Sequence, residues 1–389
     1  MEEAHDIVIV GGGICGLATA LALHRKGISS LVLEKSETLR ADGGSIGILA
    51  NGWRVLEQLG LAAELRETAN LVTAYHNVWL QGNKSILVPV RKELRWLKRK
   101  DLIETLAKNI PAGAIRFNCH VAAIHETGPG DHVVLLTTVD GSIIRAKVLI
   151  GCDGSNSVVA KYLGLSAPKS IPRAFLRGFT RYPQGHAFGT HFLRLRGKDF
   201  FVGRSPITDN LVSFFVALPT PSADITKDAN AMKDLVQERL QDQCPAEVIE
   251  MVQNSDPESL NVVASVWYRP PWQVAFGGFQ KGAVTVAGDA MHVMGSYIGQ
   301  GGSAALEDAL VLARSLSRGR EPPRETKEAA IGEYVRERRL RVARLSLESF
   351  VVGALLRAKS LVARLACVAV LALLGNESLG HADYDCGRL

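Results

Sequence analysis

The 389-residue sequence contains few cysteines and no metal-binding or nucleophile motif. Its six cysteines are scattered without a CxxC spacing, which excludes the disulfide framework of a small secreted domain and indicates reduced thiols. No HExxH helix, nucleophile elbow, Walker loop or His/Cys/Asp/Glu cluster occurs. The sequence therefore predicts no metal site, and its catalytic side chains remain unknown.

Long apolar runs are also missing. The most apolar late stretch, 360–375, is about 16 residues long and contains Arg364, whereas a membrane-spanning helix needs roughly 20. We expect a buried or surface-docked C-terminal helix there, with membrane contact as the less favoured alternative. Because the first strand is expected to begin by Asp6, no room is left for a signal or transit peptide, and the sequence favours a cytoplasmic protein.

The net charge of +6 has no concentrated basic region behind it. Two basic stretches, Arg91–Lys100 and Arg336–Arg344, are interpreted as solvated helix faces. With no zinc finger or aromatic RNA-binding platform, a nucleic-acid partner is not expected. The balance of 47% hydrophobic and 22% charged residues is typical of a soluble globular protein, and the length fits two or three domains.

The N-terminal segment carries a dinucleotide-binding signature. Ile7–Val10 form an apolar run, typical of a buried parallel strand, and Gly11, Gly13 and Gly16 follow as GxGxxG before an Ala/Leu-rich helix. Gly11 suits the tight turn, Gly13 the approach of a pyrophosphate, and Gly16 close helix packing. Glu34 ends the second strand, where it can accept hydrogen bonds from ribose hydroxyls. An acid there favours FAD or NAD over NADP.

The remaining chain favours FAD. A glycine-rich loop and helix occupy 41–61, and a hairpin at 131–165 leads into the strand Lys147–Gly154, which we expect to return to the first sheet. Alternating segments at Thr190–Gly197 and Asn210–Leu218 predict a mostly antiparallel sheet. A second glycine loop, Gly288–Gly302, lies between the apolar run Ala283–Ala287 and a predicted helix.

Three ordered motifs resemble those of the single-component (group A) FAD-dependent aromatic hydroxylases, the family of para-hydroxybenzoate and salicylate hydroxylases, and most closely the plant FAD monooxygenases. They are GGGICG with Glu34, GCDGSNSVVAKYLG at Gly151–Gly164, which is similar to "GADGxxSxVR", and Gly288–Gly302, which is similar to "GDAAHPMTPxxGQG". The resemblance extends to about Arg344.

The resemblance implies a set of cofactor-binding positions. It places Arg99 at the FAD phosphates or ribose, Val121 at adenine, Asp153 near the pyrophosphate and NAD(P)H, and Asp289 at the ribityl chain. Backbone N–H groups near Gly301 and Gly302 would face the flavin pyrimidine edge, and Gly44–Ile48 would run beside the ring. The whole predicted FAD set is Gly11, Gly13, Cys15, Gly16, Glu34, Lys35, Ile46, Arg99, Val121, Asp153, Asp289, Gly299, Gly301 and Gly302.

Not every side chain near these motifs is expected to act on the cofactor. Cys15 is interpreted as a small buried residue within the set, and His292 as a packing or hydrogen-bonding residue. Phe201, Phe215 and Tyr297 are hypotheses for the substrate pocket, with ordinary core packing the alternative. Few charged residues fall on the expected pocket strands, which favours a neutral aromatic or polycyclic substrate over a small carboxylate.

The resemblance also implies the reaction. NAD(P)H, a transient co-substrate without a βαβ unit of its own, reduces FAD, O₂ adds at flavin C4a, and the hydroperoxide transfers one oxygen to an electron-rich ring. The alternatives are a flavin-dependent epoxidase, and a flavin-binding protein without monooxygenase turnover. A halogenase would carry WxWxIP, which Val266–Trp272 does not supply. Substrate identity, the choice between NADH and NADPH, and oligomeric state stay open.

The expected fold class is α/β. A Rossmann-like FAD-binding domain, discontinuous in sequence, interleaves with a mostly antiparallel substrate domain and precedes a C-terminal helical segment. The predicted boundaries are FAD-binding parts at 1–75, 99–165 and 273–330, substrate-domain parts at 76–98 and 166–272, and the helical segment at 331–389. The second glycine loop has Val293 and Ser296 where the family has prolines, and this predicts a more flexible loop with two additional N–H donors.

Overall fold

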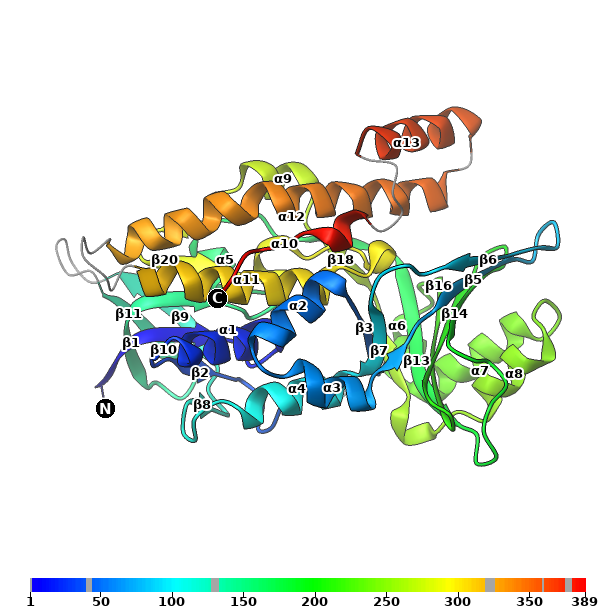
Figure 1. Ribbon diagram of the computed structural model, residues 1–389, viewed down its shortest axis with the longest axis horizontal. Helices are drawn as coiled ribbons and strands as arrows, with labels where there is room; N and C mark the ends of the chain where they lie inside the picture. Colours follow the sequence, from blue (N-terminus) through cyan, green and yellow to red (C-terminus); the bar gives the residue numbers. More distant parts are fainter. Residues whose placement is uncertain (1, 40–43, 127–132, 319–325, 359, 375–379) are drawn as a thin grey trace.

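The computed structural model describes residues 2–39, 44–126, 133–318, 326–358, 360–374 and 380–389. Residues 41–43 of the expected glycine-rich loop lie outside this set. Two large sheets occupy opposite ends of the elongated molecule, and long helices run between them (Figure 1).

The first sheet is built around β1 (Glu2–Val10), which pairs in parallel with β2 (Leu31–Leu33) and with β11 (Ile143–Gly151). Ile7–Val10 are at most 6% exposed, as expected for a strand covered on both faces. The pairing with β11 confirms that the nucleotide fold is assembled from distant parts of the chain. The eight strands follow the order β19 (Gln280–Lys281), β20 (Val284–Val286), β11, β1, β2 and β8 (Ile115–Arg116), with β9 (Val121–Glu126) and β10 (Val134–Thr138) paired beside β11.

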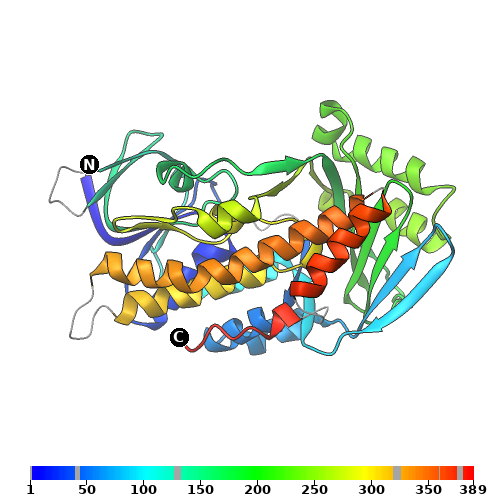
Figure 2. The same ribbon diagram turned by 90° about the horizontal axis from the view of Figure 1, so that it is seen from above.

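Helices α1 (Ile14–Arg25) and α11 (Gly301–Arg318) pack on this sheet and on each other. Residues Ile14–Leu23 of α1 are all buried, because the helix lies between the sheet and its neighbours α11 and α4 (Arg99–Lys108). The 31-residue helix α12 (Lys327–Arg357) lies beside α11 along the length of the molecule (Figure 2).

The second sheet has seven strands, and its neighbouring pairs are antiparallel except for β14 with β5. One face packs on α7 (Ala229–Leu240) and α8 (Ala246–Gln253), and the other faces the first sheet's helices. This arrangement confirms the expected fold class. The strand order is β17 (Asn261–Val263), β13 (Arg173–Arg181), β16 (Leu211–Pro219), β15 (Phe201–Thr208), β14 (His191–Arg196), β5 (Ala74–Trp79) and β6 (Lys84–Pro89).

Smaller elements connect the two sheets. A three-stranded sheet consists of β3 (Ser45–Leu49), β7 (Leu94–Lys98) and β4 (Asn70–Leu71), and β12 (Lys169–Ile171) pairs with β18 (Val266–Tyr268). The other helices are α2 (Ala50–Gln58), α3 (Ala62–Thr68), α5 (Val158–Tyr162), α6 (Ala223–Lys227), α9 (Pro271–Phe276), α10 (Asp289–His292) and α13 (Leu361–Leu374), with 3₁₀ turns η1 (Pro257–Ser259), η2 (Ser296–Ile298) and η3 (Gly380–Asp383).

The C-terminal apolar stretch forms α13, which lies on the surface against α12. None of its residues is buried, and Leu373 is 87% exposed, so the alternative of a buried helix is wrong. Within the described ranges, no helix is both long and apolar enough to cross a membrane. The final residues, 380–389, lie beside α2 (Figure 2).

Two sequence interpretations of basic stretches are wrong. The stretch Arg91–Lys100 is mainly strand β7 rather than a helix face. The stretch Arg336–Arg344 is helical, but Arg338 is 0% exposed and Arg341 is 9% exposed, so two of its arginines face the interior. Their partners are acids on α11, about 30 residues earlier in the chain.

Candidate active site

The first glycine loop forms a tight turn between β1 and α1. Gly11 has φ +106°, and a Cβ atom there would lie 2.4 Å from the Cys152 carbonyl oxygen on the neighbouring strand. A Cβ at Gly16 would lie 1.9 Å from the Gly11 oxygen, so this glycine allows close helix packing rather than lining a cavity. Gly13 is the N-cap residue of α1, and a Cβ built on it would meet no atom within 4 Å. The turn therefore leaves open space at the helix N-terminus, where an anion is favoured.

Glu34 supports this turn from the end of β2. Its side chain is buried, with Oε2 accepting a hydrogen bond from Gly12 N at 2.7 Å and Oε1 accepting one from Ser36 N at 2.9 Å. Glu34 and Lys35 both line the cavity described below. The carboxylate thus fixes the loop at the cavity wall.

Asp153 extends the same wall from the end of β11. Its Oδ2 accepts a hydrogen bond from Val158 N at 2.7 Å, while its buried Oδ1 has no hydrogen-bond partner among the described residues. Burial is the main cause that raises the pKa of Asp153. A buried acceptor without a partner is costly, so a ligand donor at this position would be stabilising.

The second glycine loop contacts the first. A Cβ at Gly288, where φ is +59°, would lie 2.9 Å from Cys15 Cβ, so the two loops pack together at these residues. Cys15 is buried, and its contact with Cys152, followed by desolvation, raises its thiol pKa. At the other end of the loop, a Cβ at Gly302 would lie 2.7 Å from Ile46 Cδ1. Strand β3 therefore packs closely on the start of α11.

His292 has the structural role expected of it. It is 0% exposed, and its Nε2 lies 2.6 Å from Asp308 Oδ2, which also accepts a hydrogen bond from Gly288 N at 2.8 Å. Asp308 Oδ1 accepts a hydrogen bond from Arg338 Nε at 2.7 Å. Burial alone would raise the pKa of Asp308, but the charges and hydrogen bonds of His292 and Arg338 lower it to about 2.

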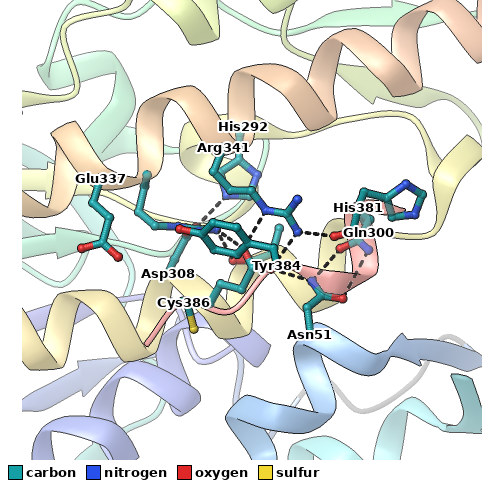
Figure 3. Close-up of polar contacts among 12 residues, drawn as sticks. Asn51, His292, Gln300, Asp308, Glu337, Arg341, His381, Tyr384 and Cys386 are labelled. Carbon is teal, nitrogen blue, oxygen red and sulfur yellow. Dashed lines mark hydrogen bonds and ion pairs between the residues drawn. The ribbon is translucent and has the colours of Figure 1, made fainter. Parts of the chain in front are cut away.

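The buried charges continue beyond Asp308 (Figure 3). Arg338 Nη2 lies 2.6 Å from Glu307 Oε2, and Arg341 Nη2 donates a hydrogen bond to Glu307 Oε1 at 2.9 Å. Asn51 Nδ2 donates hydrogen bonds to Glu307 Oε1 at 2.6 Å and to Gln300 Oε1 at 2.9 Å. We call Asn51, His292, Gln300, Glu307, Asp308, Arg338 and Arg341 the buried ion network. It joins α2, α10, α11 and α12 behind the second glycine loop.

Sequence reasoning missed this network apart from His292. Its signal is the pair Glu307–Asp308 within an otherwise apolar helix, because two adjacent acids that are both 0% exposed require cationic partners. The chain terminus also reaches the network, since Arg341 Nη2 donates a hydrogen bond to the His381 carbonyl at 2.6 Å. Tyr384 and Cys386 lie nearby (Figure 3).

One cavity of about 1200 Å³ connects the two glycine loops with the seven-stranded sheet. Every predicted FAD residue except Gly16 lines it, including Arg99 at the start of α4, Val121 on β9, and Asp289, Gly299 and Gly301 in the second loop. The three pocket hypotheses, Phe201, Phe215 and Tyr297, line it as well. Tyr297 OH accepts a hydrogen bond from Arg357 Nη1 at 2.9 Å.

The expectation of few charged residues at the pocket is wrong. Arg173, Arg177, Arg194 and Arg196, on strands β13 and β14, all line the cavity, together with Phe192 and Phe215. The arginines lie on one face of each strand, and side chains of the other face, such as Leu176 and Leu195, are buried under α7 and α8.

The second glycine loop is anchored despite its missing prolines. Val293 N donates a hydrogen bond to Asp289 O at 3.3 Å, so this N–H is used within the loop. The Val293 carbonyl accepts a hydrogen bond from Arg269 N at 2.7 Å, and the Gly295 carbonyl accepts one from Ser349 Oγ at 2.7 Å. The additional donor predicted at Val293 is therefore not free.

The fold and the cavity define a dinucleotide-binding protein whose ligand extends from a Rossmann turn to a second sheet. A family model described as "FAD binding domain" matches residues 4–349. The chain is 43% identical over its full length to the full length of "Monooxygenase 1" of Arabidopsis thaliana, and 34% identical to "Monooxygenase 2" of the same plant, with 100% of this chain and 99% of that protein covered. It is 28% identical to "3-amino-4-hydroxybenzoate 2-monooxygenase PtmB3" of Streptomyces platensis, over 79% of this chain and 78% of that one.

Solved structures share the fold. Klebsiella pneumoniae HpxO, complexed with FAD and uric acid, has a TM-score of 0.80 at 22% identity, with 98% of this chain and 96% of that chain covered. The chain therefore belongs to the FAD binding domain family of FAD-dependent monooxygenases, with relatives among the aromatic hydroxylases and in plants, and this confirms the resemblance drawn from its motifs. Its cofactor is FAD, and the open turn at Gly13 and the partnerless Asp153 Oδ1 fit such a group.

Proposed function

We propose that the protein uses NAD(P)H and O₂ to hydroxylate an aromatic or polycyclic small molecule. The observation that carries this proposal is the single cavity that runs from the first glycine loop to an aromatic face of the second sheet. The Streptomyces platensis relative is named for a monooxygenation of an amino-hydroxybenzoate, and this supports a ring substrate.

Bound FAD would supply the electron transfer and the oxygen activation. The chain's own residues would hold it, with Gly11 and Gly13 at the pyrophosphate, Glu34 at the ribose and Asp289 at the ribityl chain. The 18-residue helix α11 begins at Gly301 on the cavity wall, and its first N–H groups have no partner within the helix. The positive end of this helix would stabilise negative charge on a bound flavin.

The remaining cavity residues would position the substrate and exclude water. Phe192 stacks on Trp96 with ring centroids 4.6 Å apart, and Phe215 lies 5.7 Å from Phe201 and 5.8 Å from Phe175. Aromatic faces of this kind bind a flat ring by stacking, while their apolar surface lowers the local dielectric constant. NAD(P)H would bind transiently rather than at a separate domain.

The test begins with purification of the native protein and its visible flavin spectrum. We expect bound FAD, and NAD(P)H oxidation that a panel of phenols and polycyclic aromatics stimulates, with one labelled oxygen atom from isotopic O₂ in the product. A protein without flavin would refute the proposal. Flavin without stimulated NAD(P)H oxidation would favour a flavin-binding protein without turnover, and an epoxide product would favour an epoxidase.

A further inference from the structure

Large apolar side chains are exposed on one side of the molecule. Helices α9, α12 and α13 share this side, which is uppermost in Figure 1 and faces the viewer in Figure 2. All three contribute apolar side chains that are 43–87% exposed. A group of such side chains on a folded protein marks an interaction site. We call the following residues the apolar face: Trp272, Phe276, Leu340, Leu356, Leu361, Val362, Leu365, Val368 and Leu373.

Helix α13 is apolar around its whole circumference. In its sequence, LVARLACVAVLALL, only Arg364 and Cys367 are not aliphatic. A helix of this composition is ordinarily buried in a protein core or in a bilayer. Here none of its residues is buried, and ten of the 14 are exposed. Its outer side is therefore left uncovered by the described part of the chain.

The length of α13 decides how it could meet a bilayer. At 1.5 Å per residue its 14 residues extend about 21 Å, whereas the hydrocarbon core is about 30 Å thick. The helix is thus too short to span. Resting on α12 with one side, it can insert its outer side into the boundary between headgroups and acyl chains.

Helix α9 adds aromatic side chains suited to that boundary. Trp272 is 53% exposed and Phe276 is 86% exposed. The Trp272 ring lies 6.4 Å from the ring of Phe350 on α12, and Lys169 Nζ lies 5.8 Å from its centroid. Tryptophan is enriched at membrane–water interfaces, and a lysine beside it can extend its ammonium group to the headgroups.

The charged groups at the apolar face have one sign. Every charged residue of the segment 349–374 is basic, and α9 contains none. Arg357 and Arg364 are exposed. Glu348, the acid directly before this segment, is bound by His381 Nδ1 at 2.9 Å. An apolar surface with basic residues at its border is therefore presented to a partner.

This charge distribution favours an anionic lipid surface over a second copy of the chain. In a two-fold dimer the same patch meets itself, so the basic residues of both copies would come together without acids between them. Negatively charged lipid headgroups would instead attract these residues.

We propose that the apolar face docks on an anionic lipid surface, with α13 lying in the plane of the headgroups. Arg364 of α13 and the residues Leu355, Leu356 and Arg357 at the end of α12 also line the cavity. Docking therefore places an edge of the cavity beside the lipid, where an apolar substrate can enter without crossing water. The inference goes beyond the proposed function and does not depend on turnover.

The test measures binding of the FAD-loaded protein to vesicles by flotation. Vesicles of phosphatidylcholine alone are compared with vesicles containing about one third phosphatidylserine. We expect tighter binding to the anionic vesicles, and release as the salt concentration rises, because ions screen the attraction. Brominated acyl chains should quench the tryptophan fluorescence of the wild-type protein, and this quenching should decrease in W272F.

Variants separate the apolar from the charged contribution. L365E and L373E, at side chains 59% and 87% exposed, should each weaken vesicle binding about tenfold or more. R364Q should weaken binding to anionic vesicles about fivefold and leave binding to neutral vesicles unchanged. The matched control is V139E, at a side chain 66% exposed between β10 and β11, which lie at the opposite end of the molecule from α13 (Figure 1). It should bind as the wild type does.

Flavin content and circular dichroism check that each variant folds. Absence of vesicle binding, equal binding to the two kinds of vesicle, or equal binding by L365E and V139E would overturn the inference. A dimer in light scattering that L365E dissociates, without vesicle binding, would identify a second copy as the occupant and would also overturn it. Failure of the proposed function would appear separately, as absent flavin or unstimulated NAD(P)H oxidation.

Discussion

The R338M substitution tests the buried ion network most directly. Arg338 is 0% exposed and contacts Glu307 at 2.6 Å and Asp308 at 2.7 Å, so methionine keeps much of its volume but leaves two buried carboxylates without their shared cation. Removing one partner of a buried ion pair costs about 3–5 kcal/mol.

The expected change in melting temperature follows from this cost. Unfolding entropy is about 2.1 cal/mol/K per residue, or roughly 0.8 kcal/mol/K for this chain, so a single unfolding transition would shift by about 4–6 °C. Calorimetry of the FAD-free protein measures the shift. The control is R336M, two residues earlier on α12, where the arginine is exposed and forms no ion pair among the described residues.

The pH dependence gives a second measurement with a definite sign. In the wild-type protein the pKa of Asp308 is lowered from 3.8 to about 2, so its contribution to stability is present above pH 4 and is lost as the pH falls toward 2. Without Arg338, burial is less opposed and the Asp308 pKa rises. The ionised carboxylate then destabilises R338M at neutral pH, and protonation removes that cost at lower pH. The difference from wild type should therefore narrow between pH 7 and pH 4.

The network also predicts a functional effect of R338M. Asp308 accepts the Gly288 N–H, so a displaced Asp308 should disturb the second glycine loop and weaken FAD binding. Equal melting temperatures for R338M and R336M, or a stability difference that does not change with pH, would refute the reasoning.

Three further predictions concern the cofactor loops. G11A should fold poorly, because φ is +106° and a Cβ would lie 2.4 Å from neighbouring backbone. A Cβ at Gly13 would meet no atom within 4 Å, so G13A should keep the melting temperature of the FAD-free protein. The affinity of G13A for FAD, measured by fluorescence titration, should fall about tenfold or more. D153N should stabilise the FAD-free protein at neutral pH, because burial raises the pKa of the native carboxyl and makes its ionised form unfavourable. Melting curves should show this difference in melting temperature from wild type vanish as the pH falls below 4, where the wild-type carboxyl is protonated. The V293P/S296P variant, which has the family's prolines, should lose about 1 kcal/mol or less in free energy of unfolding, because the Val293 N–H donates over a long 3.3 Å. Its ratio of hydroxylated product to released peroxide should rise. An unchanged ratio would contradict a role of the loop in coupling.

Features that depend on neighbouring residues in the sequence could be predicted. The glycines of both loops, the apolar strand Ile7–Val10 and the acid Glu34 each need a residue type at a fixed short spacing, because a tight turn and a helix N-terminus are local structures. The sequence around His292 also contains no second metal ligand, which predicted a packing or hydrogen-bonding residue. This agrees with its buried contact with Asp308.

The buried ion network could not be predicted in this way. Arg338 and Arg341 belong to a stretch with charges all around the helix, and only the packing of α12 on α11 decides which of them are interior. The prediction that few charged residues line the pocket was wrong for a related reason. Alternation in the segment Thr190–Gly197 shows that the two faces of β14 differ in polarity, but it does not show which part of the protein packs on each face. The polar face is covered by the FAD-binding half of the molecule, which the local pattern does not contain.

The two glycine loops are coupled to each other and to the chain terminus. Gly288 packs on Cys15 of the first loop, and its N–H is held by Asp308, whose partner Arg338 also contacts Glu307. Glu307 binds Arg341, which in turn donates a hydrogen bond to the carbonyl of His381. A continuous series of hydrogen bonds and ion pairs therefore connects the His381 carbonyl to the Gly288 N–H of the second glycine loop. Since residues 380–389 lie about 80 positions beyond the second loop, this connection depends on the assembled fold and on no motif of their own.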